Sequence, residues 1–170
     1  MKKCLIYLLL AAMLLSFVAC TENSNPSGEE EKTYTFTSGT TKIAIHDDAT
    51  PILEALGEWR DYATSNSCHF KGIDKVYTYA GFSLQTYPQE EKDFVYMISF
   101  YDDTVATEEG IRIGNTKEDV IKAYGTPDKQ DAGSLKYRAS EMYLEFLLQE
   151  DGTVRNIRYC HPLQETVEAS

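Results

Sequence analysis

The residues best suited to chemistry in this chain are its three histidines, His46, His69 and His161, and the cysteine Cys68 that precedes His69. A zinc site needs at least three converging ligands, usually including a close pair, and a thiol nucleophile needs a histidine that the fold brings to it. The histidines are scattered along the chain, and the acids that follow His46 suit a polar loop before a helix. We therefore expect no metal, no cofactor and no catalytic residues.

Two further kinds of pattern would indicate chemistry. The chain has no G-x-S-x-G elbow, no phosphate-cradling glycine loop and no H-E-x-x-H pair. Acids gather at Asp102, Asp103, Glu108 and Glu109, and calcium favours oxygen-rich loops. The run lacks the spacing of an EF-hand, so a solvated linker explains it better. These patterns favour a protein that is not an enzyme.

Tyrosine is unusually frequent, with 12 in the chain. Strand alternation predicts that Tyr87, Met97, Tyr143 and Glu145 share the sheet face that points away from the helices. Tyrosine and methionine are common at protein interfaces. We expect these four residues, called here the candidate face, to bind a partner; the alternative is that another part of the chain half-covers them.

The single tryptophan, Trp59, opens the other candidate region. About twenty residues separate Gly57 from the next expected strand, whereas the corresponding connection later in the chain takes about ten. Such an insertion often carries recognition residues, so Trp59 joins the candidate binding residues. The alternative is that Trp59 closes one end of the core.

These residues must be positioned by elements that occur twice. Residues 111–127 (IRIGNTKEDVIKAYGTP) align without a gap on residues 43–59 (IAIHDDATPILEALGEW). Apolar residues and the closing glycine coincide: Ile43, Ile45, Ile52 and Gly57 with Ile111, Ile113, Val120 and Gly125. Self-similarity of this kind indicates a repeat architecture.

Each copy predicts a short helix. In the second copy, Thr116 is a good N-cap, Asp119 completes a capping box, and Gly125 ends the helix. In the first copy, Asp48 aligns with Thr116, although Thr50 before a proline is an equally good start. Helices of about two turns are too short to be stable alone, so their apolar sides must pack on a sheet.

That sheet is predicted from six segments that alternate apolar and polar residues: 75–80, 82–87, 94–101, 135–139, 142–149 and 153–160. Phe82 and Leu84 should pair with Ile98 and Phe100, and the corresponding apolar residues of the last two strands with Ile157 and Tyr159. The fold class is therefore α+β, with two tandem helix-plus-three-stranded antiparallel meanders forming one sheet and the short helices on one face.

The pattern of the second copy resembles the repeat of the BLIP-like and BamE-like (SmpA/OmlA) lipoprotein superfamily. The matching positions are Ile111, Gly114, Thr116, Val120, Gly125 and Pro127. The first copy has His46 where the family has glycine, and it lacks the proline. The resemblance implies a non-catalytic binding module. In an inhibitor of this superfamily, two such units form one concave sheet that holds an enzyme, and the resemblance implies a similar arrangement here. It transfers no site residue to this chain.

The N-terminus predicts export and lipidation. Two lysines, an apolar run and small residues precede Cys20, as in a secretory signal peptide. Residues 17–20 (FVAC) resemble a lipobox, except that Phe17 replaces the usual leucine; without lipidation the protein would simply be secreted. We expect a signal peptide at 1–19, a flexible tether at 20–33, repeat 1 at 34–104 and repeat 2 at 105–170, anchored to a bacterial membrane by lipidated Cys20.

Charge and cysteine content limit the partners. The formal net charge is −11, which disfavours nucleic acid and makes basic proteins, peptides and cations easier partners. In an oxidising compartment Cys68 and Cys160 could form a disulfide, or both could remain free thiols. We expect an extracytoplasmic protein that binds a protein or peptide; the alternatives are an inhibitor of a secreted or envelope hydrolase and a small hydrolase or metal-dependent enzyme.

Overall fold

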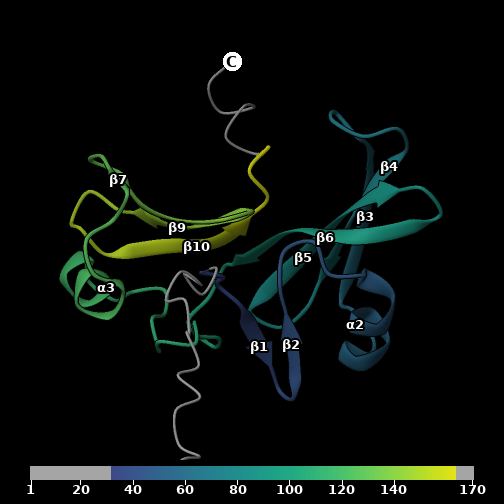
Figure 1. Ribbon diagram of the computed structural model, residues 1–170. Helices are drawn as coiled ribbons and strands as arrows, with labels where there is room; N and C mark the ends of the chain where they lie inside the picture. The colour runs from purple at the N-terminus through teal and green to yellow at the C-terminus, as the bar shows by residue number, and fades with distance from the viewer. Residues whose placement is uncertain (1–31, 164–170) are drawn as a thin grey trace, which may run out of the picture. The chain divides into compact units, whose positions relative to one another are not determined.

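The computed structural model describes residues 32–163, which form an α+β fold (Figure 1). The first half contains strands β1 (Phe36–Ser38) and β2 (Thr41–Ile43), helix α2 (Ala49–Leu56), and strands β3 (Asp61–Asn66), β4 (Ile73–Thr78), β5 (Phe82–Gln89) and β6 (Lys92–Phe100). The second half contains helix α3 (Lys117–Tyr124) and strands β7 (Lys129–Gln130), β8 (Ser134–Ala139), β9 (Met142–Leu148) and β10 (Val154–Cys160).

One antiparallel sheet runs through both halves in the order β3-β4-β5-β6-β10-β9-β8-β7. The last strand of each half forms the junction, where β6 pairs with β10. Phe100 lies opposite both Phe82 and Ile157, and Ile98 lies opposite both Leu84 and Tyr159. In the second half, Phe146 and Leu144 lie opposite Ile157 and Tyr159, so the apolar pairing predicted within each half is confirmed.

The core lies on one face of this sheet. Helices α2 and α3 and the β1–β2 hairpin all cover that face, as Figure 1 shows. Phe36 of the hairpin packs edge-on against Phe82 and Phe100. The largest fully buried side chains on this face are Tyr137, Tyr159, Phe36, Phe100 and Phe146.

Capping residues set both ends of each helix. Thr116 and Asp119 form the expected capping box. Of the two possible starts of the first helix, the structure uses Asp48, whose carboxylate accepts a hydrogen bond of 3.0 Å from the N–H of Thr50. Gly57 and Gly125 then end the helices with φ of 74° and 81°, values that favour glycine.

The loops before the two helices also share their geometry. His46 and Gly114, which occupy aligned positions, both have positive φ, at 74° and 91°. The N–H of His46 donates to the Val95 carbonyl at 2.9 Å, and the N–H of Gly114 donates to the Val154 carbonyl at 2.8 Å. Each loop is thus hydrogen-bonded to the last strand in its own half.

The prediction of six strands in the sheet was wrong, because the sheet has eight. The insertion after Trp59 contains β3, whose six residues are all exposed, and the shorter connection contains the two-residue β7. β3 has no buried face, so its sequence carries no alternation of apolar and polar residues.

Two further features concern the membrane. Within residues 32–163, no helix is long and apolar enough to cross a bilayer. The predicted signal peptide, the predicted lipidation site Cys20 and most of the predicted tether lie outside the described residues.

Candidate functional site

The candidate face is mostly buried, which corrects the prediction. Tyr87, Tyr143 and Glu145 are 4%, 1% and 3% exposed, and Met97 is half-buried. The strand alternation did place these residues away from the helices, but other side chains cover them. Two different arrangements account for this, one in each half of the sheet.

In the first half, an aromatic cluster covers Tyr87. Phe70, from the loop between β3 and β4, stacks on the Tyr87 ring at 4.2 Å between centroids. The rings of His161 and Tyr96 lie 5.5 Å and 5.9 Å from the same ring. The insertion therefore folds back over the sheet face that it was expected to leave open.

This cluster brings together two histidines that are far apart in sequence. The rings of His46 and His161 lie 4.4 Å apart. The Nε2 atom of His46 donates to the Glu141 carbonyl at 3.0 Å, and its Nδ1 atom lies 3.2 Å from the Tyr87 hydroxyl oxygen. His161 Nδ1 accepts from the N–H of Leu163 at 3.1 Å.

Both ring nitrogens of His46 and the Nδ1 atom of His161 thus have partners within the fold. Between residues 32 and 163, no three His, Cys, Asp or Glu side chains converge where a metal ion could be held. Burial, and then the nearby His46 and His69, lower the pKa of His161 to about 4. The imidazole of His161 is therefore neutral near pH 7.

In the second half, a row of charged side chains crosses three strands. Lys136 on β8 and Arg158 on β10 lie on either side of Glu145 on β9. The Lys136 Nζ to Glu145 Oε1 distance is 3.5 Å, the Arg158 Nε to Glu145 Oε2 distance is 3.0 Å, and Lys136 Nζ lies 4.1 Å from the centre of the Tyr143 ring. Buried charges need such partners.

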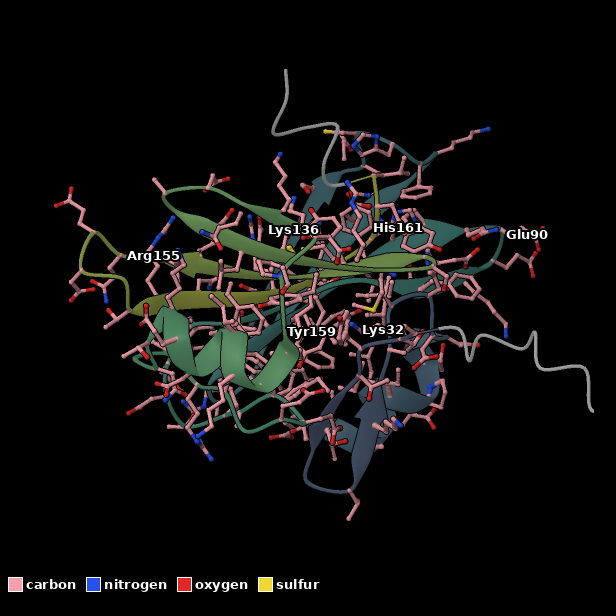
Figure 2. All side chains as sticks on the ribbon, turned by 60° about the vertical axis from the view of Figure 1, so that its left-hand side comes forward. Lys32, Glu90, Lys136, Arg155, Tyr159 and His161 are labelled. Carbon is pink, nitrogen blue, oxygen red and sulfur yellow. The ribbon has the colours of Figure 1, made fainter. Side chains whose placement is uncertain are left out.

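This row forms the floor of a polar hollow of about 440 Å³ that Lys129, Asp131 and Arg155 also line. Figure 2 shows Lys136 and His161 on one side of the sheet and Tyr159 on the other, beside α3. The side opposite the helices therefore carries an aromatic cluster in one half and an ionic row in the other.

Cys68 and Cys160, the two cysteines among residues 32–163, are both free, so the disulfide alternative was wrong. Cys160 ends β10 and is buried in the sheet, whereas Cys68 is exposed in the loop after β3. Burial raises the pKa of the Cys160 thiol to about 12. A thiol so rarely ionised is a poor nucleophile.

The region around Trp59 is open. Trp59 and Tyr62 are 45% and 44% exposed. Their rings lie 6.0 Å apart, and both contact Tyr77 of β4, at 5.1 Å from Trp59 and 5.2 Å from Tyr62. Tyr77 is itself buried, so it forms the base on which the two exposed rings rest.

A groove of about 750 Å³ lies between these aromatic residues and helix α2. We call it the Trp59 groove; its lining residues are Thr50, Leu53, Glu54, Gly57, Glu58, Trp59 and Tyr77. Leu53, Trp59 and Tyr77 supply its apolar surface. Trp59 was predicted as a binding residue, but Tyr62 and Tyr77 were not, because only the pairing of β3 with β4 brings them to it.

Strand β3 beside the groove is an end of the sheet. β4 is its neighbour on one side, and no described strand pairs with its other side. Its six residues, DYATSN, include one charged residue, Asp61, whose carboxylate accepts a hydrogen bond of 2.9 Å from the N–H of Tyr62. An extended chain could therefore pair with this edge, next to exposed aromatic rings.

Comparisons with known proteins find a similar fold but no family to which the chain could be assigned. No protein-family description matches the sequence, and no curated protein matches it either. The fold is similar to part of the crystal structure of an extracellular protein containing an SCP domain from Bacillus anthracis str. Ames. The TM-score is 0.53 at 14% identity, and the match covers 72% of this chain and 45% of that chain. At this identity the similarity concerns the fold alone.

Proposed function

We propose that this protein is a non-catalytic, extracytoplasmic binding protein, anchored through lipidated Cys20, that binds an extended segment of a protein or peptide along β3. The observation that carries the proposal is the six-residue, fully exposed strand at the end of the sheet. Backbone hydrogen bonds to such an edge provide affinity, and nearby side-chain pockets provide specificity.

The contrast between the two ends of the sheet supports this site. Exposed edge strands invite pairing with other chains, and proteins usually protect them by shortness, lysine or proline. The far end is protected in this way, since β7 is only two residues long and begins with Lys129. β3 is three times as long and contains neither lysine nor proline.

The proposal also explains why the two halves differ. The aligned loops, the glycine helix ends and the meanders support a tandem repeat with a boundary near residue 104, as in the lipoprotein superfamily that the sequence resembles. The shared parts build the scaffold. The long β3 and the Trp59 groove belong to the first half only, so they are the part that a function specific to this protein would use.

Selection of random linear peptides on the full chain tests the function. We expect selected peptides to slow amide hydrogen exchange across residues 61–66. Thr64→Lys, which places a charge on β3, should weaken their binding at least tenfold, and Gln130→Lys at the opposite end of the sheet should leave it unchanged. Peptides that bind Thr64→Lys as well as the unmodified protein would refute strand addition at β3.

A further inference from the structure

The Trp59 groove has an unusual combination of surfaces. One wall is aromatic, formed by Trp59 and Tyr77 with Tyr62 beside them. The opposite wall is the last turn of α2 and the residues that follow it, where Glu54 and Glu58 are both exposed and both line the groove. Its charged lining residues are therefore two carboxylates, without any lysine or arginine.

The basic residues nearby do not pair with these carboxylates. Lys75 precedes Tyr77 on the same strand, and its Nζ lies 2.5 Å from Asp93. Arg60 follows Trp59, and no ion pair within residues 32–163 joins it to Glu54 or Glu58. The carboxylates of the groove are thus not neutralised by these cations, and the overall charge of −11 strengthens the negative potential there.

Aromatic faces and carboxylates attract the same kind of ligand. A ring presents a negative face to a cation within about 6 Å, most strongly when the ring is tryptophan. Carboxylates add direct attraction for that cation and repel anions. The planar guanidinium group suits both surfaces, since it stacks on rings and donates hydrogen bonds to carboxylates.

We infer that the Trp59 groove binds an arginine side chain of the partner segment, with the guanidinium between the aromatic wall and the carboxylates of Glu54 and Glu58. This inference rests on the proposed function, because it names the side chain that a peptide paired with β3 would place in the adjacent groove. It also makes the groove, rather than the backbone edge, the source of specificity.

Trp59 itself provides the measurement, because it is the only tryptophan of the chain. The full chain in a non-ionic maltoside detergent is titrated with N-acetyl-arginine amide and with N-acetyl-citrulline amide, a neutral analogue of nearly the same shape. We expect the arginine compound to change Trp59 fluorescence with millimolar half-saturation, and the citrulline compound to bind at least tenfold more weakly.

Charge variants show whether the groove is responsible. Combined Glu54→Gln and Glu58→Gln should reduce the preference for arginine to less than threefold, since the aromatic wall alone remains. The matched control is Glu90→Gln with Glu91→Gln in the β5–β6 turn, which removes the same charge outside the groove and should keep the preference. Equal binding of arginine and citrulline, or an unchanged preference in the Glu54/Glu58 variant, would overturn the inference.

The two proposals fail in different ways. If selected peptides pair with β3 but replacing their arginines with citrulline changes nothing, the inference about the groove is wrong and strand addition stands. If the small arginine compound binds as expected while no peptide pairs with β3, strand addition is wrong and the groove is a site for a free organic cation.

Discussion

The titration of His161 offers the most direct test of the aromatic cluster. Its imidazole is surrounded by Tyr96, Tyr87, Phe70 and His46, and burial lowers its pKa to about 4 from 6.5. Between these pH values the unfolded chain binds a proton that the folded chain does not. The free energy of unfolding must therefore fall as the pH falls from 6.5 towards 4.

The magnitude follows from the width of this window. Each pH unit within it contributes up to about 1.4 kcal/mol, so the full window corresponds to about 3 kcal/mol. Because the ring is only partly buried, water screens some of the cost, and we expect a loss of about 2 kcal/mol, most of it before pH 5. Carboxylates with lowered pKa, such as Asp48 and Asp119, contribute their own loss near and below pH 4, outside this range.

Urea unfolding at pH 7, 6 and 5 measures the effect. His161→Phe keeps a flat ring against Tyr96 but cannot bind a proton, so its stability should change by less than about 0.5 kcal/mol over the same range. His69→Asn, at an exposed position, should retain most of the dependence of the unmodified protein. A His161→Phe variant as sensitive to pH as the unmodified protein would refute the reasoning, as would a flat profile of the unmodified protein.

Three other predictions concern single residues. Thr116→Ala removes half of the capping box of α3 and should lower stability by about 1 kcal/mol in urea unfolding, whereas Thr37→Ala in the β1–β2 hairpin should cost less. Gly125→Ala places a side chain at φ 81° and should cost about 1 kcal/mol; no loss would contradict the strain argument. Iodoacetamide should modify Cys68 in the folded protein within minutes and Cys160 only after unfolding, as mass spectrometry can show; equal rates would contradict the burial of Cys160.

Much of the fold could be predicted because its signals are local. Capping residues, closing glycines and period-two alternation depend on neighbours within a few positions, so both helices and six strands were placed to within about two residues. The pairing of β6 with β10, by contrast, joins residues about sixty positions apart, and no local pattern in the sequence predicted it.

β3 and the candidate face were mispredicted for a different reason. Alternation shows which residues share a face, but it does not show what covers that face. Tyr87 is buried by Phe70, and Glu145 by two cations on neighbouring strands, and neither contact leaves a trace in the local pattern. β3 has no buried face at all, so its one signal was its place in an insertion.

His46 shows how a departure from a repeated pattern can indicate a tertiary contact. The aligned position in the second half is Gly114, and a non-glycine residue at φ 74° costs about 1 kcal/mol. The histidine offsets this cost through its ring, which bonds Tyr87 of the first half and the Glu141 carbonyl in the β8–β9 turn of the second. Glycine at position 46 would relax the backbone but remove a link between the halves. Histidine in place of glycine at position 46 therefore indicates a tertiary contact. The loop before α2 contributes this side chain to the face opposite the helices.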